Sequence, residues 1–263
     1  MPPINAVVVC VGYDDLLKVT MPTLLPHVAQ MVVVTAPQDE RTQEYLKDFP
    51  NARAHVTDAF YRDGAKFNKG AGMEEGFDAL GRSGWILVLD ADILVPPDLT
   101  DRIERLRPRK GNLYNPRRRI LENPADWWQY TNPQKWGKLP LRKEDKGHYG
   151  YFQLFHAADP ALAGRPWYPT DFVHAGQCDD KFQHKWPLDR KLRPDFEVLH
   201  LGKCDENWFG RTTGRMDGEP LDGPVDERKE LQTRLRRKHG WGGKRDPNEN
   251  LEERVRKPDG PSS

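Results

Sequence analysis

The sequence predicts an α/β fold whose centre is a sheet of parallel strands. Within residues 1–100, short apolar runs of strand length alternate with longer segments of helical character. The apolar runs lack a polar alternation, which is typical of strands covered on both faces. Strand, helix and strand at this spacing are typical of a Rossmann-like half-sheet. In such sheets ligands bind at the carboxyl ends of the strands, so the loops there are the first places to look for function.

The elements of this half follow one another in a regular order. We expect strands at 6–11, 31–35, 52–56 and 85–89. We expect helices at 15–25, interrupted by Pro22, at 41–49, and at the end of the segment 66–80. The alternation places the loops Gly12–Asp15, 36–40 and Asp90–Asp92, and the entry to the helix at Asn68, at the carboxyl ends of strands.

Composition limits the functions that this chain can have. The 263 residues are 37% hydrophobic and 31% charged, and the 41 Lys and Arg nearly balance the 40 Asp and Glu. A net charge of +1 predicts no global attraction to nucleic acid or to an anionic membrane. No apolar run is long enough to span a membrane, and the N-terminus has no signal-peptide pattern.

The cysteines indicate a compartment. Cys10, Cys178 and Cys204 have no CxxC spacing, and an odd, sparse set is typical of reduced thiols. We therefore expect a cytoplasmic protein.

The central stretch is WILVLDADILVPP, from Trp85 to Pro97. Side chains two apart on a strand point the same way, so Asp90 and Asp92 are expected to leave the strand end on one side. Two carboxylates are costly to bury together without a counter-charge. Mg²⁺ or Mn²⁺ supplies that charge and binds one or two carboxylates together with diphosphate oxygens. The alternative is a polar loop that happens to contain two Asp residues.

The neighbouring loops suit a nucleoside diphosphate. Gly12 allows close approach of the backbone, Asp39 can accept from a base N–H or a ribose hydroxyl, and Lys69 can meet a phosphate or the base. Each residue also has a simpler interpretation, since a loop Asp commonly forms turns and a Lys is commonly solvated.

The second half differs in composition. A helix at 99–106, capped by Asp98 or Thr100, leads into a basic cluster at 105–119 that is either a solvated face or an anion-binding surface. The segment 112–168 is rich in Trp, Tyr and Pro, and 147–155 is expected to form a strand. These aromatic residues can form a second core or platforms for a sugar or a base.

Asp179 and Asp180 are expected at the start of a helix that carries Phe182 and Trp186 on one face. They either cap the helix or supply a general base, a task that carboxylates perform when burial and neighbouring charge raise their pKa.

His200 ends a strand at 196–201 and is either a buried structural histidine or a third metal ligand. The Gly-containing loop 203–215 follows, in which Arg211 and Arg215 can meet phosphates. Residues 226–239 are expected to form a charged helix, and 241–263 a disordered tail.

Together these features resemble the nucleotide-sugar-dependent glycosyltransferases with the GT-A fold, in particular the family-2-like members. The resemblance covers about residues 6–215, and it is most specific at LDAD followed by ILVP and at HLG followed by NWFGR. It implies a Rossmann-like mixed central sheet flanked by helices. It also implies a transferase domain at 1–218, with a nucleotide-sugar half at 1–100 and an acceptor half at 101–218, before the charged helix and tail of 219–263.

The resemblance also implies roles for individual residues. Asp92 resembles the main metal ligand of a DxD motif, Asp90 the motif's first acid, and His200 the histidine that completes the metal site. Asp39 and Lys69 resemble donor-binding residues, and Arg211 or Lys203 is expected to help hold the diphosphate. Asp179 resembles the catalytic acid that ends an xED motif, but Cys178 replaces the usual Glu, so Asp180 remains a competing base.

The implied activity is a metal-dependent transfer of a sugar, with inversion, from a nucleotide donor to an acceptor hydroxyl. UDP-sugars are favoured as donors, with Mn²⁺ or Mg²⁺ as the cofactor. The acceptor is unidentified: a saccharide is one candidate, and a hydroxymethylated base in DNA is the second choice.

Two other classes compete with this interpretation. A phosphatase of the haloacid dehalogenase type would have Thr or Val at the position of Leu94. A nucleotidyltransferase would have a Gly-rich, Arg-containing loop after the first strand, where this sequence has GYDD. A non-catalytic nucleotide- or carbohydrate-binding module would have no need of the intact Asp90, Asp92, Asp179 and His200.

Overall fold

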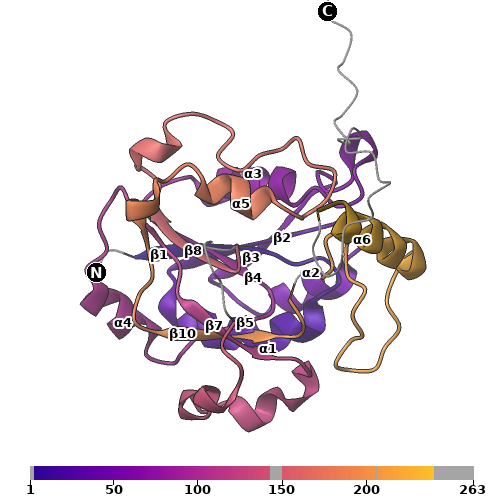
Figure 1. The fold of residues 1–263 in the computed structure, drawn as a ribbon, viewed down its shortest axis with the longest axis horizontal. Helices are drawn as coiled ribbons and strands as arrows, with labels where there is room; N and C mark the ends of the chain where they lie inside the picture. Colours follow the sequence, from indigo (N-terminus) through magenta and orange to yellow (C-terminus); the bar gives the residue numbers. More distant parts are fainter. Residues whose placement is uncertain (1–2, 143–149, 205, 240–263) are drawn as a thin grey trace, which may run out of the picture.

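The computed structural model describes residues 3–142, 150–204 and 206–239, and Figure 1 shows the arrangement of their elements. The first half contains β1 (Ile4–Val9), α1 (Asp14–Leu24), β2 (Gln30–Thr35), α2 (Glu40–Leu46), β3 (Ala52–Val56), α3 (Lys69–Leu80), β4 (Trp85–Asp90), β5 (Ile93–Leu94) and α4 (Leu99–Leu106). The second half contains β6 (Leu113–Tyr114), β7 (Arg117–Leu121), β8 (Phe152–His156), α5 (Cys178–Gln183), β9 (Lys191–Leu192), β10 (Glu197–Leu201) and α6 (Val225–His239).

The main sheet is mixed, as the sequence predicts. Its strand order is β3-β2-β1-β4-β8-β6-β9. The first four of these strands run parallel, and β8 joins β4 in the antiparallel direction. The expected α/β class and the Rossmann-like half are therefore confirmed.

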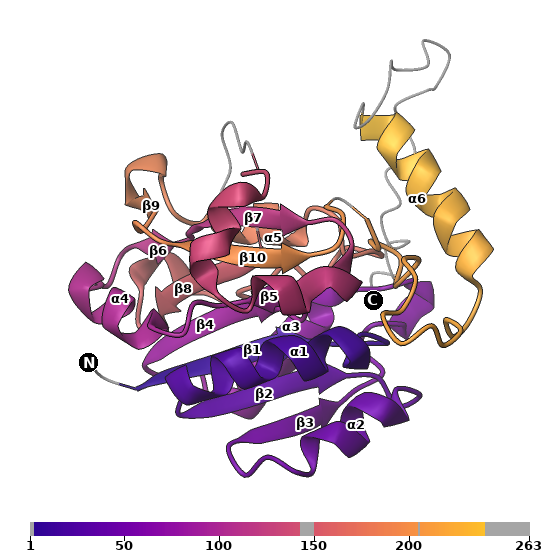
Figure 2. The same cartoon turned by 90° about the horizontal axis from the view of Figure 1, so that it is seen from below.

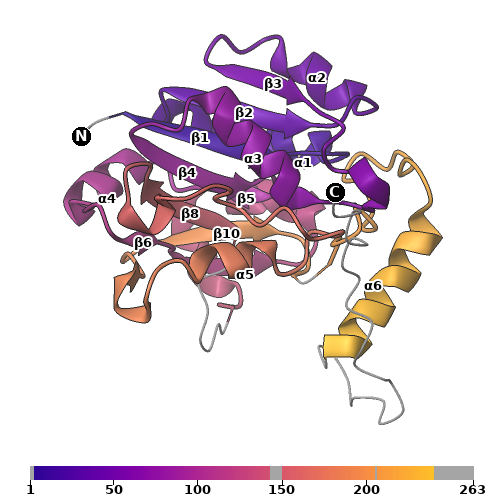
Figure 3. The same cartoon turned by 90° about the horizontal axis from the view of Figure 1, so that it is seen from above.

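Helices cover the main sheet on both faces (Figures 2 and 3). On β1, Ala6 and Val8 belong to the core that includes Leu17 and Met21 of α1. Val7 faces the other way and belongs to the core that includes Phe77 of α3. Because both faces are covered, both sets of alternating residues are apolar, which explains the unbroken runs in the sequence.

A second, smaller sheet was not predicted. Its strand order is β5-β10-β7, with β10 antiparallel to β5 and parallel to β7. The stretch from Asp90 to Leu94 therefore does not form one continuous strand. Strand β4 ends at Asp90, Asp92 lies in a turn, and β5 then enters the second sheet. This corrects the expectation that both carboxylates leave the end of one strand.

Several expected elements have different bounds. Helix α5 ends at Gln183, so Trp186 lies beyond it, although its ring still packs on Phe182 at a centroid distance of 5.1 Å. The strand expected at 147–155 is β8 (Phe152–His156), and residues 147–149 lie outside the described residues, as does the expected tail at 241–263. The charged helix expected at 226–239 is confirmed as α6.

Within the described ranges, no helix is both long enough and apolar enough to cross a membrane.

Helix α3 lies close to the sheet because it presents glycine there. A Cβ added at Gly76 would lie 2.5 Å from Cγ2 of Val34 and 2.8 Å from Cγ1 of Val7. Both valines are fully buried on strands, so neither can move aside freely.

We expect Gly76→Ala to destabilise the protein. Alanine favours the helix by about 1 kcal/mol, but overpacking at this contact costs about 1–3 kcal/mol, so the clash outweighs the propensity. Chemical denaturation measures the change, and Gly164→Ala is the control because a Cβ there meets nothing within 4 Å. A Gly76→Ala protein more stable than wild type would contradict this packing.

Candidate functional site

A cavity of about 640 Å³ opens where the main sheet and the second sheet meet. The cavity is lined by residues after β1, residues at the start of α3, the turn after β4 and the loop after β10. The residues are Val9, Val11, Tyr13, Phe67, Lys69, Asp90, Ala91, Asp92, Arg118, Arg142, Gly150, Tyr151, Ala175, Gly176, Gln177, Asp179, Asp180, His200, Lys203, Glu206, Asn207, Trp208 and Gly210. The cavity thus lies at the carboxyl ends of β1 and β4, as the sequence predicts.

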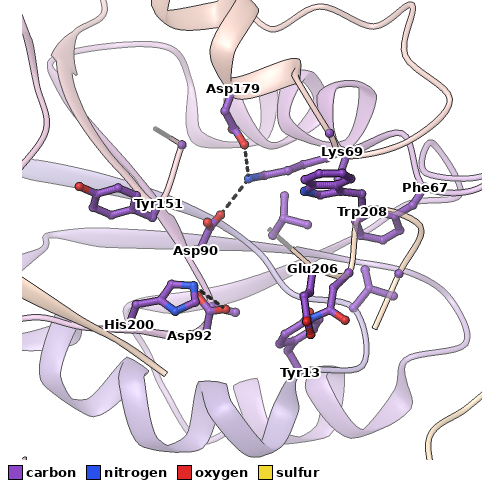
Figure 4. Close-up of a pocket in the computed structure, with 18 of the residues that line it drawn as sticks. Tyr13, Phe67, Lys69, Asp90, Asp92, Tyr151, Asp179, His200, Glu206 and Trp208 are labelled. Atoms are coloured by element: carbon purple, nitrogen blue, oxygen red, sulfur yellow. Dashed lines mark hydrogen bonds and ion pairs between the residues drawn. The ribbon is translucent and has the colours of Figure 1, made fainter. Parts of the chain in front are cut away.

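Lys69 joins two carboxylates inside this cavity (Figure 4). Its Nζ donates to Oδ1 of Asp90 at 2.8 Å and to Oδ2 of Asp179 at 3.0 Å. The lysine side chain is 9% exposed, so the charge is shielded from water. Lys69 opens α3, and Asn68 fixes that end because its side chain accepts from Ala71 N and donates to Thr170 O.

The shared ammonium affects the two carboxylates differently. Burial raises the pKa of Asp90, but the charge and hydrogen bond of Lys69 outweigh burial and leave that pKa below its usual value. Burial also raises the pKa of Asp179, and there the opposing effect of Lys69 is partly cancelled by the charge of Asp90, so this pKa remains raised. Asp179 is therefore the more basic of the two carboxylates, which suits a proton acceptor.

A second contact orients Asp179. The hydroxyl of Tyr168 lies 3.0 Å from Oδ1 of Asp179 and also contacts the amide of Gln153. A carboxylate only accepts, so we assign the proton of the Tyr168 hydroxyl to the hydrogen bond with Asp179. We orient the Gln153 amide so that its NH₂ group donates to the Tyr168 oxygen. Gly150 packs directly on this carboxylate, since a Cβ there would lie 1.9 Å from Cγ of Asp179.

Asp92 and His200 face each other across the floor of the cavity. Oδ2 of Asp92 lies 3.6 Å from Nε2 of His200, and both side chains are mostly buried. Nδ1 of His200 donates to the carbonyl oxygen of Gly202 at 3.0 Å, which leaves Nε2 with its lone pair in the neutral ring. Oδ1 of Asp92 is buried and has no hydrogen-bond partner among the described residues.

This pair fits two ligands of one divalent cation. Ligands held about 2.1 Å from a single ion lie about 3–4 Å from one another, and a carboxylate with an imidazole suits Mn²⁺ or Mg²⁺. The unpaired oxygen of Asp92 and the lone pair of His200 both lack the positive partner that a cation supplies. Across residues 3–142, 150–204 and 206–239, no group of three or more His, Cys, Asp and Glu is arranged for a metal. Mg²⁺ usually keeps several waters and binds through one or two carboxylates, so a site with few protein ligands is compatible with this ion.

Asp180, the competing base, also lines the cavity but has a different environment. Its side chain is 48% exposed, and it accepts from Nε2 of Gln183 at 2.7 Å and lies 3.8 Å from His184. These partners are on its own helical turn, and nearly half of the side chain faces solvent.

Three predicted donor-site residues, Gly12, Asp39 and Arg211, lie outside the described lining of the cavity. Asp39 caps α2 and accepts from Gly12 N at 2.8 Å, from the hydroxyl of Thr35 at 3.0 Å and from the hydroxyl of Thr42 at 2.8 Å. Its carboxylate thus holds the turns after β1 and β2 together.

Arg211 forms a buried ion pair with Asp15. Both side chains are 3% exposed, and Nη2 of Arg211 donates to Oδ2 of Asp15 at 2.9 Å. The guanidinium also donates to the carbonyl of Gly12 and lies 4.8 Å from the ring of Tyr13. Arg211 therefore ties the loop after β10 to the start of α1.

Other cavity residues were not singled out as site residues from the sequence. Tyr13, Tyr151, Glu206 and Trp208 line the cavity, and Arg118 lies 4.2 Å over the Tyr151 ring. Arg118 belongs to the basic cluster at 105–119, which the structure divides. Arg119 pairs with Glu197 at 2.7 Å, on the opposite face of β7, so the cluster is not a single surface.

No protein-family model matches the sequence, and no curated protein matches it. Among solved structures, the chain is similar to glucosyl-3-phosphoglycerate synthase from Mycobacterium tuberculosis in complex with Mn²⁺, UDP and glucosyl-3-phosphoglycerate. The two share 12% identity and a TM-score of 0.45, over 89% of this chain and 77% of that chain. The chain is also similar to 4-diphosphocytidyl-2C-methyl-D-erythritol synthase from Anaerococcus prevotii, at 13% identity and a TM-score of 0.40, over 89% and 96% of the two chains. At these identities the likeness concerns the fold.

We expect Arg211→Met to destabilise the protein by about 3–5 kcal/mol, because the carboxylate of Asp15 would remain buried without its counter-charge. Methionine keeps most of the volume, so the loss reports the charge. The control is Arg234→Met, whose partner Glu230 is 63% exposed and whose loss is expected to cost no more than about 1 kcal/mol. Denaturant unfolding of both variants measures the difference, and equal losses would refute the structural role of Arg211.

Proposed function

We propose that this protein is a metal-dependent glycosyltransferase with the GT-A fold. It transfers a sugar from a nucleoside-diphosphate donor, a UDP-sugar being favoured, to an acceptor hydroxyl. The observation that carries the proposal is one cavity that holds a metal-type pair, Asp92 and His200, beside a carboxylate of raised pKa, Asp179. A metal near a diphosphate and a base near a hydroxyl are the two groups that this reaction needs.

Asp92 and His200 would hold Mn²⁺ or Mg²⁺ at the floor of the cavity. The ion supplies positive charge against the negative charge that develops on the departing diphosphate. The carboxylate of Asp90 lies in the same region, but its Oδ1 already accepts a hydrogen bond from Lys69. Lys69 carries a positive charge of its own. Burial lowers the pKa of this ammonium, but the negative charges of Asp179 and Asp90 outweigh burial and raise the pKa well above its usual value.

Asp179 is the proposed general base. It accepts the proton of the acceptor hydroxyl while the hydroxyl oxygen forms a bond to the anomeric carbon of the sugar. The bond from that carbon to the diphosphate breaks on the opposite face, so one displacement inverts the centre. Tyr168 and Lys69 hold one oxygen each of the Asp179 carboxylate, which fixes its direction before the acceptor binds.

The two halves of the domain share these tasks, and His200 of the second half lies beside Asp92 of the first at the proposed metal site. Residues 1–100 supply Lys69 and the Asp90–Asp92 turn for the donor. Residues 101–218 supply Gly150, Tyr151 and Asp179, so we place the acceptor against this wall. Position 150 must be glycine for this arrangement, because any side chain there would overlap the Asp179 carboxylate.

We expect nucleotide release from one of a panel of UDP-, GDP- and dTDP-sugars to require Mn²⁺ or Mg²⁺ and to stop with EDTA. Asp92→Asn should lower that release by at least about 100-fold, because the metal loses a charged ligand. Asp226→Asn, on exposed α6, is the matched control. If no donor turns over and no nucleotide binds with metal, the glycosyltransferase proposal fails.

We expect Asp179→Asn to lower the rate of transfer by about 10²–10⁴-fold while donor affinity stays within a few fold, because the amide cannot accept the proton. Asp180→Asn is the matched comparison, one residue away in the same helix, and should keep most of the activity. Steady-state rates and nucleotide titrations separate the two effects. A large loss in Asp180→Asn with an active Asp179→Asn would exchange their roles.

A further inference from the structure

The donor's base needs a recognition group, and the structure narrows the choice. The carboxylate of Asp39 accepts from the hydroxyls of Thr35 and Thr42 and from the backbone N–H of Gly12 and Thr42. It is 8% exposed and lies outside the lining of the cavity. Oδ2 accepts three of these hydrogen bonds and Oδ1 accepts one at 3.3 Å, so this carboxylate already serves to hold two turns together.

The cavity contains another carboxylate on the side where a nucleoside would extend. Strand order reverses between β1 and β4, and ligands in open α/β sheets bind in the crevice at that point. Tyr13, just after β1, lines this crevice. In Figure 4, Tyr13, Glu206 and Trp208 lie on one side of the Asp90–Asp92 turn, and Tyr151, on the proposed acceptor wall, lies on the other.

Glu206 is held at this position by its neighbours. Oε1 of Glu206 lies 3.7 Å from Nη2 of Arg236 on α6, and its side chain is 25% exposed. The next residue but one, Trp208, donates its backbone N–H to Oε1 of Gln232 on the same helix at 3.0 Å. Helix α6 thus supports the segment that carries both the carboxylate and an indole ring into the cavity.

We propose that Glu206 is the residue that reads the donor's base, a role that rests on the proposed function. Its carboxylate accepts a ring N–H from the base, while Trp208 contributes apolar surface. An ionised carboxylate only accepts hydrogen bonds, so it favours bases with a ring N–H, namely uracil, thymine and guanine. Cytosine and adenine have an acceptor nitrogen at that ring position, so they can donate to the carboxylate only through their exocyclic amino groups.

The first arm of the test is calorimetric titration of wild type with UDP, dTDP, GDP, CDP and ADP in the presence of Mn²⁺. We expect one of the first three to bind most tightly. Glu206→Ala should weaken that nucleotide by about 10- to 100-fold, the usual effect of losing a hydrogen bond to a charged group. Glu219→Ala is the matched control, because Glu219 is 59% exposed and lies outside the cavity lining.

The second arm replaces the ring N–H of the tightest nucleotide with N–CH₃. Wild type should lose about the same 10- to 100-fold, whereas Glu206→Ala, which no longer has the acceptor, should discriminate less than about 3-fold. Thermal unfolding of Glu206→Ala checks that the fold is kept.

The outcomes separate the two proposals. Tight, metal-dependent binding that Glu206→Ala leaves unchanged would overturn the role of Glu206 and leave the glycosyltransferase proposal standing. Tightest binding of CDP or ADP would also overturn it. Absence of any nucleotide binding would overturn both.

Discussion

The ammonium of Lys69 lies between the carboxylates of Asp90 and Asp179, and the candidate site depends on this one charge. Two carboxylates that share a buried cavity repel each other and are poorly solvated. Lys69 offsets both effects with hydrogen bonds of 2.8 and 3.0 Å. It joins β4, which carries Asp90, to α5, which carries Asp179, so the same charge links two elements that are far apart in the sequence.

The rim of the cavity depends on a second set of buried charges. Asp14 and Asp15 begin α1, and Arg215 and Arg211 reach them from the loop after β10, with Nη1 of Arg215 at 2.6 Å from Asp14. Each pair is nearly excluded from water, so breaking one partner leaves an uncompensated charge. These pairs hold a long loop against the end of β1. Neither Arg211 nor Arg215 lines the cavity, so these residues shape it indirectly, by fixing the loop beside β1.

Much of the fold could be predicted from local pattern. The parallel strands of the main sheet are short apolar runs because helices cover both faces, and that burial is visible in the sequence itself. The second sheet was missed because β5 has only two residues, too few for any periodicity. Its effect is large, since it turns the chain between Asp90 and Asp92 and brings His200 to face Asp92.

The sequence by itself determined the fold class, the acidic turn after β4 and the presence of an acid pair before Phe182. Those features are set by neighbours along the chain, through burial and spacing. Only the tertiary structure decided which acids pair with Lys69 and that Glu206 enters the cavity. It also decided that Asp39 accepts hydrogen bonds from the two turns beside it. These outcomes depend on contacts between residues far apart in sequence, such as Lys69 with Asp179, and the free energy of a buried charge depends on its partner in space.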